Sequence, residues 1–365
     1  MKFKFRFSLR ALMIATTISG LVLVPFAIQM NKAIQQKKAV AWVLEQNGWV
    51  IYDSGDMQAP FPTFGPSLTD ESPYSDWLTQ LLGQDFFEEV HHVDLWGAED
   101  LSQIVAFPEL KTISITVILN QIDFDNLNKL KELESISIQN SIGINHHPLE
   151  LSPLQELKSL KTLELEFKNF SGLGSLSQLQ ELSLNNCNSD NYSAIKQLKN
   201  LRELRIRGRI LGDISFTANL ENLKSINLYL LEITNIGPLS DLKQLEKVQI
   251  YGRKITELPS LKNWQKIYHF DIEHTGVSDI TPLADLTNVR DLELNGTKIS
   301  DLSPLAELHE LRRLDVGGTK VTDLTPLYGL KKLEHLSVRN TQVTEFEIQQ
   351  LQQQLPNCKI YDSIP

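Results

Sequence analysis

Acidic side chains recur at a fixed interval near the C-terminus: Asp271, Glu293 and Asp315 are 22 residues apart. Pairs of carboxyl groups can perform general acid–base catalysis, and a row of them can hold calcium, which takes roughly six to eight oxygen ligands. We call these three residues and their charged neighbours the acidic set, which consists of His269, Asp271, Glu273, Asp291, Glu293 and Asp315.

No recognised catalytic motif accompanies the acidic set. The sequence lacks G-x-x-x-x-G-K-[ST], H-E-x-x-H, G-x-S-x-G and paired C-x-x-C motifs. The set is expected on an open surface, and nothing in the sequence predicts the apolar enclosure that raises the pKa of one carboxyl group in an acid–base pair. Arg290, Arg312 and Arg313 can neutralise the carboxylates in place of calcium. We therefore expect a protein that is not an enzyme and has no metal, cofactor or small-molecule substrate.

A second candidate group combines arginine with tyrosine on three successive predicted strands: Arg202, Arg205, Arg207, Arg209, Tyr229 and Tyr251. Tyr229 and Tyr251 follow Arg207 at intervals of 22 residues. Arginine and tyrosine are favoured anchors at protein interfaces. Beside the acidic set they form a surface with two signs of charge, which can orient a charged partner. The alternative is a solvated sheet face whose charges only keep the surface wet.

Both groups depend on a repeated Leu-x-x-Leu-x-Leu pattern with a period of 22 residues. Its successive first apolar residues are Leu179, Leu201, Leu223, Leu245, Ile267, Val289, Leu311, Leu333 and Leu355. A fixed period with this pattern predicts a leucine-rich-repeat solenoid, an α/β horseshoe with a parallel sheet on its concave face. Because side chains alternate along a strand, the first, fourth and sixth residues should face the core. The third, fifth and seventh should face the concave surface.

The rest of each repeat is predicted to return along the convex side. Earlier, irregularly spaced copies begin at Val90, Leu110, Leu133 and Leu160, so the repeat domain is expected over residues 90–365. A proline in the motif [ST]-D-[IL]-[ST]-P-L excludes a long helix there and favours a 3₁₀ turn. A glutamine-rich helical turn before Leu355 is expected to cap the C-terminal end. The ninth residue should satisfy buried backbone groups and bridge neighbouring turns, and in four copies it is threonine: Thr275, Thr297, Thr319 and Thr341.

The N-terminal residues predict a membrane anchor. Residues 1–10 contain four basic and no acidic side chains, and residues 11–30 contain no charge. Twenty helical residues span about 30 Å, the thickness of a bilayer core. The excess of positive charge before the span predicts a single pass with a cytoplasmic N-terminus and the repeat domain on the non-cytoplasmic side. The alternative is a cleaved signal peptide.

Residues 31–89 are expected to shield the open N-terminal end of the solenoid. They predict a helix, a turn at Asn47 and Gly48, and a strand over residues 49–52. Residues 53–74 contain four prolines and few aliphatic side chains, which predicts a flexible insert, and a short helix is expected over residues 76–82. His91 and His92 are adjacent on a predicted strand and should point to opposite faces, so they cannot easily share a metal ion.

Composition narrows the classes of partner. The formal net charge of −10 argues against a general nucleic-acid binder, which requires a basic surface. Cys187 and Cys358 fall at inward positions about eight strands apart, at roughly 4.8 Å per strand. That separation excludes a disulfide, which requires Cα atoms within about 7 Å, so both cysteines are expected to be buried packing residues.

The 22-residue units with the motif D-[IL]-x-P-L resemble the internalin-like class of bacterial leucine-rich repeats over roughly residues 90–365. The segment FSLRALM, followed by WLTQLLGQDFFEEVHHVDL at residues 77–95, resembles bacterial single-pass membrane-anchored leucine-rich-repeat proteins of undefined function. The first resemblance implies that the concave face binds a protein. Threonine replaces the asparagine that internalins favour at the ninth position, and no cell-wall sorting segment follows Leu355, so binding to a host receptor is not carried over.

Together these patterns predict a noncatalytic leucine-rich-repeat domain displayed on the bacterial cell membrane. Its concave face is expected to bind a protein partner on the non-cytoplasmic side. The alternative is a structural or self-associating protein of the cell envelope without a dedicated ligand.

Overall fold

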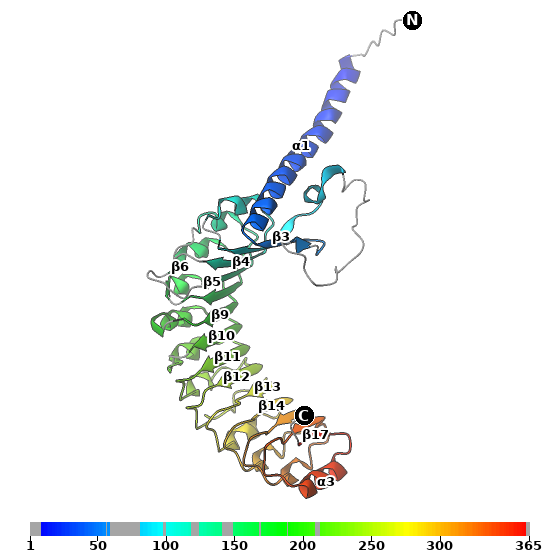
Figure 1. Ribbon diagram of the computed structural model, residues 1–365. Helices are drawn as coiled ribbons and strands as arrows, with labels where there is room; N and C mark the ends of the chain where they lie inside the picture. The colour runs from blue at the N-terminus through cyan, green and yellow to red at the C-terminus, as the bar shows by residue number, and fades with distance from the viewer. Residues whose placement is uncertain are drawn as a thin grey trace. The chain divides into compact units, whose positions relative to one another are not determined.

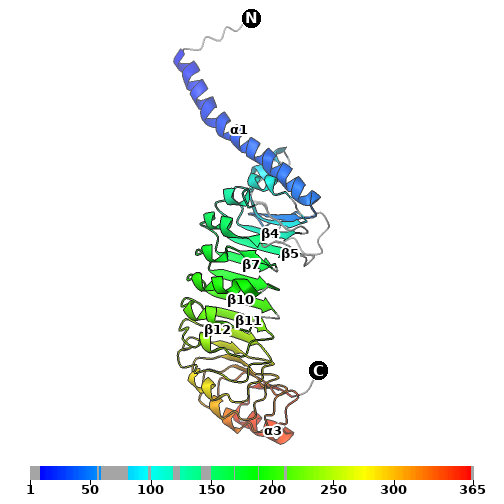
Figure 2. The same ribbon diagram turned by 90° about the vertical axis from the view of Figure 1, so that its left-hand side faces the viewer.

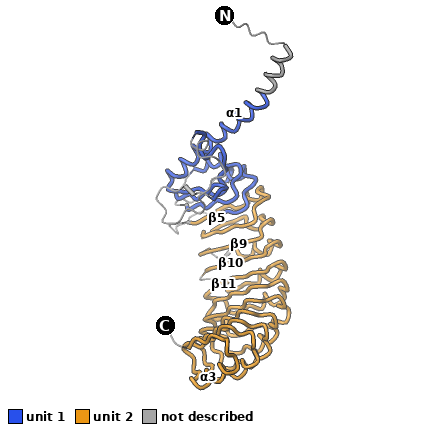
Figure 3. Tube along the Cα trace, turned by 90° about the vertical axis from the view of Figure 1, so that its right-hand side faces the viewer, with its two compact units in different colours: residues 1–136 blue, residues 137–365 orange. Residues whose placement is uncertain are grey.

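The computed structural model describes residues 9–55, 57–58, 81–97, 100–117, 124–140, 149–167, 169–187, 189–208 and 212–362, with the backbone alone for residues 9–19, 57–58, 117, 140 and 189–191. The chain forms two compact units, residues 1–136 and 137–365, which we call the N-terminal and C-terminal units (Figure 3). Most of the predicted insert over residues 53–74, most of the predicted helix over residues 76–82, and Arg209 lie outside the described residues. The predicted segment boundaries at residues 10, 30 and 89 stay predictions.

The N-terminal unit pairs one long helix with a small sheet. Helix α1 (Leu9–Glu45) ends before Asn47, which has a left-handed φ of 55°. Strand β1 (Trp49–Tyr52) pairs antiparallel with β2 (Met57–Gln58) and with β3 (Val90–Trp96), and β3 pairs in parallel with β4 (Thr112–Val117). The predicted strand over residues 49–52 is therefore confirmed. Because β1 covers the edge of β3, that edge is not open to pairing with another chain.

Buried polar contacts hold α1 in the N-terminal unit. The Gln36 side-chain amide donates hydrogen bonds to the Glu88 carbonyl oxygen at 2.7 Å and to Asp85 Oδ1 at 3.2 Å. The Tyr52 hydroxyl donates to the same Asp85 oxygen at 2.9 Å. Since Gln36 and Tyr52 are buried, losing either partner would leave a buried polar group unsatisfied. These contacts fix the position of α1 along the unit.

The membrane span predicted over residues 11–30 lies within α1. Among the residues whose side chains are described, no helix is both long and apolar enough to cross a membrane. The first nine residues of the predicted span, 11–19, lie outside that set. The anchor therefore stays a prediction.

Parallel strands run through the C-terminal unit in the order of the sequence, one for each repeat. They are β5 (Ser135–Asn140), β7 (Thr162–Glu166), β9 (Glu181–Asn185), β10 (Glu203–Gly208), β11 (Ser225–Leu230), β12 (Lys247–Tyr251), β13 (His269–Asp271), β14 (Asp291–Glu293), β15 (Arg313–Asp315), β16 (His335–Ser337) and β17 (Lys359–Tyr361). Figure 2 shows these strands stacked one above another. A small second parallel sheet pairs β6 (Leu149–Glu150) with β8 (Phe170–Ser171).

The register of the strands confirms the predicted repeat. Leu292 pairs with Leu314, and Leu314 pairs with Leu336, on adjacent parallel strands. Within one copy, Val289, Leu292 and Leu294 are all fully buried, as the pattern predicts. In Figure 1 the strands of the C-terminal unit lie along the inner side of its bend and the 3₁₀ turns along the outer side. The predicted leucine-rich-repeat solenoid with a concave parallel sheet is therefore present.

The return segments form the expected 3₁₀ turns, including η9 (Thr281–Asp285), η10 (Ser303–Leu305) and η11 (Thr325–Leu327). An aspartate two residues before each turn orders its first residue. Asp279 Oδ1 accepts hydrogen bonds from the Thr281 backbone N–H at 2.9 Å and from its hydroxyl at 2.6 Å. These two hydrogen bonds lower the pKa of Asp279. The aspartate of the motif therefore initiates the turn, since a short side chain can satisfy an otherwise free N–H.

The ninth-position threonines act differently from the prediction. The hydroxyl of Thr297 donates to the Leu294 carbonyl oxygen of its own turn at 2.6 Å, and Thr275 and Thr319 make the same bond three residues back. Neighbouring turns are joined by backbone instead, as where the Lys298 N–H donates to the Val277 carbonyl oxygen at 2.8 Å. The predicted bridging was wrong because a hydroxyl has one proton to donate, and here it closes its own turn.

The last repeat departs from the 22-residue period. Leu336 pairs with Ile360, not with Cys358 as the period predicts. Helix α3 (Glu345–Gln354), which begins with a capping box formed by Thr344 and Glu347, replaces the 3₁₀ turn in this repeat. An α-helix rises about 1.5 Å per residue and a 3₁₀ helix about 2.0 Å, so the helical return needs more residues for the same distance.

Both cysteines are buried and unbonded, as predicted from their positions. Burial raises the pKa of each thiol to about 11, so the reactive thiolate is disfavoured at neutral pH. Cys187 and Cys358 are therefore packing residues.

Candidate binding surface on the concave sheet

The strand register brings the acidic set together on three neighbouring strands. Asp271 on β13 pairs with Glu293 on β14, and Glu293 pairs with Asp315 on β15. One pleat earlier, His269 pairs with Asp291. The predicted carboxylate row is confirmed, and its side chains are half-buried. Adjacent parallel strands lie about 4.8 Å apart, so these carboxyl groups act on one another.

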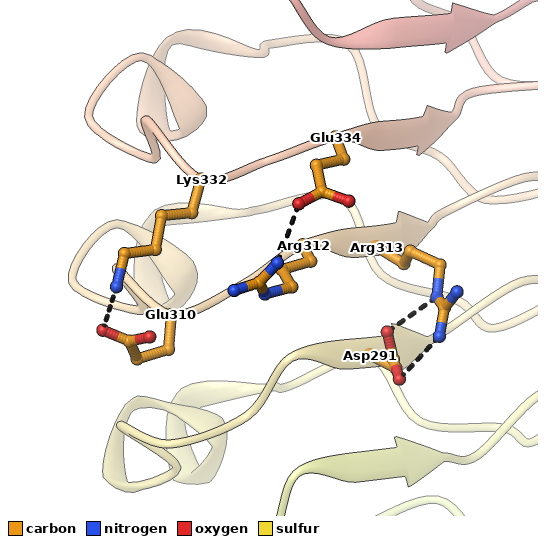
Figure 4. Close-up of polar contacts among 6 residues, drawn as sticks. All are labelled: Asp291, Glu310, Arg312, Arg313, Lys332 and Glu334. Atoms are coloured by element: carbon orange, nitrogen blue, oxygen red, sulfur yellow. Dashed lines mark hydrogen bonds and ion pairs between the residues drawn. The ribbon is translucent and has the colours of Figure 1, made fainter.

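Asp291 is neutralised by an arginine of the next repeat. Arg313 Nε lies 2.7 Å from Asp291 Oδ1, and a terminal guanidinium nitrogen lies 3.0 Å from Oδ2 (Figure 4). Such a two-point contact is the strongest form of arginine–carboxylate pair. His269 Nδ1 approaches Asp291 from the other side at 3.9 Å. The carboxylate of Asp291 is therefore occupied by contacts within the sheet and is a poor candidate for contact with a partner.

Two further ion pairs in Figure 4 also join successive repeats. Arg312 contacts Glu334 at 2.9 Å, and Lys332 contacts Glu310 at 2.6 Å. All four side chains are substantially exposed, so each pair contributes about 0–1 kcal/mol. These pairs follow the stacking of the repeats rather than mark a site.

The three carboxylates of the row have no arginine, lysine or histidine within ion-pair distance in the described part of the chain. Asp271 accepts hydrogen bonds from the Glu273 backbone N–H at 3.0 Å and from the Gln249 side chain at 3.4 Å. Asp315 accepts from the Gly317 N–H at 2.7 Å. These neutral donors hold Asp271 and Asp315 in place without forming an ion pair with them.

Glu293, at the centre of the row, has a pKa above its ordinary value. Burial, followed by the negative charges of Asp315, Asp271 and Glu273, raises its pKa to about 7. Burial also raises the pKa of Asp271. The expectation that no carboxyl group here would have a raised pKa was wrong, because partial burial and the neighbouring carboxylates both disfavour the charged form of Glu293.

The pKa of His269 lies below its ordinary value. Burial, and then the positive charge of Lys247, lower its pKa, against the opposing effect of Asp291. Its Nε2 is buried and has no hydrogen-bond partner within the described ranges. In the same ranges, no group of three or more His, Cys, Asp or Glu side chains is arranged to hold a metal ion.

The tyrosines and one arginine form a continuous stack on the strands before the acidic set. The Arg207 guanidinium carbon lies 5.7 Å from the centre of the Tyr229 ring. The Tyr229 and Tyr251 rings are 4.3 Å apart and nearly parallel, at 5°, and His274 meets Tyr251 edge-on at 5.7 Å. We call these four residues the aromatic ridge. Tyr229 remains 41% exposed, so the ridge is ordered and also accessible.

Sequence reasoning missed His274 as a member of the ridge. It occupies the eighth position of its repeat and has a left-handed φ of 54°, where the next two repeats have Gly296 and Gly318 with positive φ. A non-glycine residue with positive φ is uncommon. Comparing the eighth position of successive 22-residue repeats could have singled out His274, since histidine occupies a position where the next two repeats have glycine.

The structure separates the arginines that the sequence grouped together. Arg205 is exposed on β10 and pairs with Glu203 of its own strand at 3.0 Å. Arg202 precedes the strand and lines a polar hollow on the side of the sheet, formed by Gln178, Gln180, Asn200, Arg202, Asn222, Lys224 and Gln244. Of the four arginines in the predicted group, only Arg205 and Arg207 are therefore described on the concave face.

Two solved bacterial structures share this fold. An internalin from Listeria monocytogenes matches with a TM-score of 0.61 and 22% identity, over 75% of this chain and 82% of that one. A leucine-rich-repeat protein of Leptospira interrogans matches with a TM-score of 0.55 and 21% identity, over 71% and 74%. No protein-family model and no curated protein matches the sequence. At this level of identity the likeness establishes the internalin-like solenoid fold.

Proposed function

We propose that this internalin-like leucine-rich-repeat solenoid is a noncatalytic protein-binding domain that contacts its partner through the concave sheet. The observation that carries the proposal is the aromatic ridge, an accessible stack of Arg207, Tyr229, Tyr251 and His274 on the inner face. Arginine and tyrosine dominate binding hot spots. Stacking already fixes these side chains, so little conformational entropy remains to be lost on binding.

The raised pKa of Glu293 does not require a catalytic role. Its cause is burial together with neighbouring carboxylates. General acid–base pairs work when their environments separate the pKa values of two groups beside a substrate. Here the whole row lies along the inner sheet face, where burial and then repulsion between like charges account for the raised pKa of Glu293. A binding role for this face is therefore the simpler interpretation.

Replacing Tyr229 and Tyr251 together with alanine should weaken partner binding at least about tenfold, as expected for loss of a hot spot. The full chain is immobilised and used to capture proteins from an extract of the source cells, and the captured protein is then titrated against the wild type and the variant. Circular dichroism should show an unchanged fold, because the Tyr229 side chain is 41% exposed.

The matched control is Tyr268→Ala. Tyr268 is 43% exposed but lies in a hollow on the side of the sheet, with Glu246 and Arg290. It should leave binding unchanged. Equal loss in the control would exclude the concave face as the contact surface, and capture of no protein at all would favour the structural alternative.

We further propose that α1 holds the domain on the bacterial cell membrane, with the repeats on the non-cytoplasmic side. The support is a run of exposed apolar side chains on α1: Leu21, Val22, Leu23, Val24 and Ile28. Exposed apolar surface of this extent is unfavourable in water.

The full chain should therefore remain with membranes after an alkaline carbonate wash. The double variant Val22→Asp, Val24→Asp should be released for the most part, because charged residues in a bilayer core cost about 2.5–3.5 kcal/mol each on insertion scales. Protease added to intact cells should digest the repeats. Recovery of the wild type in the soluble fraction, or protection of the repeats from external protease, would contradict this localisation.

A further inference from the structure

The concave face carries opposite charges at a fixed separation. Arg207 on β10 has no ion-pair partner among the described residues, and its charge acts on the Tyr229 hydroxyl. On β13 to β15, Asp271, Glu293 and Asp315 likewise lack a cationic partner in the described ranges. Tyr229 on β11 and Tyr251 on β12 lie on the strands between Arg207 and the acidic row, so the order along the sheet is arginine, tyrosine, carboxylate.

The spacing between these regions is set by the strand ladder. Glu293 lies on β14, four strands along the sheet from β10, which carries Arg207. The register places Glu293 in the row of Arg205, two residues before Arg207 along the strand direction. Four steps of about 4.8 Å separate the two strands by about 19 Å. An extended peptide advances about 3.3 Å per residue, so about six residues cover this distance.

We propose that the partner presents an extended segment that crosses the strands, with an acidic side chain at Arg207 and a basic side chain about six residues away at Asp271, Glu293 and Asp315. The inference rests on the proposed function and adds the chemistry and orientation of the partner. Charge complementarity supports it, since Arg207 and the row of Asp271, Glu293 and Asp315 have no ion-pair partner among the described residues.

The geometry of the ridge specifies the middle of the segment. The Tyr229 and Tyr251 rings stack face to face, with Arg207 over the outer face of Tyr229 and His274 against Tyr251. The rings therefore present their edges and hydroxyl groups to a partner. Ring edges suit apolar side chains, and the hydroxyl groups suit backbone carbonyl oxygens. A neutral, apolar stretch between the two charged ends fits this arrangement.

The acidic row, Asp271, Glu293 and Asp315, would be stabilised by a cation. Burial and the charges of Asp315, Asp271, Glu273 and Asp291 raise the pKa of Glu293 to about 7, and Arg313 is already paired with Asp291. A lysine or arginine of the partner among Asp271, Glu293 and Asp315 would relieve this repulsion.

The test uses the full chain and labelled peptides as probes. The main probe has two glutamates, a spacer of about six alanine and proline residues, and two lysines. A scrambled probe of the same composition mixes the charges, and two further probes carry lysine or glutamate at both ends. Fluorescence anisotropy gives each Kd at two salt concentrations, because charge pairing weakens with ionic strength.

The main probe should bind about tenfold more tightly than the scrambled probe. Arg207→Glu should weaken the main probe and favour the all-lysine probe, whereas Glu293→Lys should weaken the main probe and favour the all-glutamate probe. Arg207→Gln and Glu293→Gln should weaken the main probe without these reversals. Unchanged circular dichroism shows that the variants fold.

Three results would each overturn the inference. The main and scrambled probes could bind equally, or both charge-reversed variants could change preference in the same direction. The third is no binding of the main probe at millimolar concentration. If the full chain still captures a partner through Tyr229 and Tyr251, the proposed function stands while this inference fails. If that capture also fails, the proposed function itself is wrong.

Discussion

Replacing Trp264 with alanine should lower the free energy of unfolding of the C-terminal unit by about 3–5 kcal/mol, the usual cost of removing a large buried aromatic side chain. Trp264 is fully buried, at 0% exposure, and its ring packs edge-on against Phe270 at 5.7 Å. Its indole N–H donates to the Leu239 carbonyl oxygen at 3.0 Å. Alanine would create a cavity and remove one of the two hydrogen bonds that the Leu239 oxygen accepts, leaving the one from the Leu242 backbone N–H at 3.0 Å.

Urea unfolding followed by far-ultraviolet circular dichroism measures this loss. Trp264→Leu should cost less than alanine, because the same repeat position holds a buried leucine in the next copies, at Leu286 and Leu308. Phe346→Ala is the control: Phe346 is 67% exposed in α3, and its loss should change stability by at most about 0.5 kcal/mol. Similar losses for Trp264→Ala and Phe346→Ala would show that Trp264 does not anchor the core.

Glu293→Gln should stabilise the protein at pH 8 by about 1–2 kcal/mol, after allowance for the partial exposure of the side chain, and have almost no effect at pH 4. The folded state raises the Glu293 pKa from its ordinary value of 4.5 to about 7. Below 4.5 both the folded and the unfolded chain hold the proton. Between 4.5 and 7 only the folded chain holds it, so rising pH destabilises the wild type. Above 7 the full cost of the buried charge remains.

Urea unfolding of the wild type and Glu293→Gln at pH 4, 6 and 8 tests this window. The difference between the two proteins should grow with pH and level off above about pH 7. The comparison at pH 4 is the internal control, because glutamine resembles the protonated glutamic acid in size and charge. A difference that stays constant from pH 4 to pH 8 would contradict a raised pKa at this residue.

Several features were predictable because they depend only on periodicity. Identical copies of one pattern must adopt one local conformation, and stacking them buries a continuous core. The alignment of Leu292, Leu314 and Leu336 and the adjacency of Asp271, Glu293 and Asp315 both follow from this rule. The succession of Arg207, Tyr229 and Tyr251 across three strands does as well. The proline of each return segment similarly predicted the 3₁₀ turns.

The last repeat marks the limit of periodic reasoning. Counting 22 residues assigned Cys358 as the partner of Leu336, but α3 shifts the pairing to Ile360. The type of helix on the return segment changes the length of chain that one turn of the solenoid consumes. The repeated pattern does not predict the number of residues in a turn of the solenoid once the return segment changes its type of helix.

The periodic pattern alone predicted the solenoid, the strand register from β9 to β16 and which residues share the concave face, since these follow from local pattern and stacking. Only the tertiary structure decided how those side chains interact. It paired Arg313 with Asp291, placed His274 against Tyr251, and shielded Glu293 until its pKa rose to about 7. Each of these outcomes depends on side-chain direction and on exclusion of water by residues about one repeat away, and spacing along the chain specifies neither.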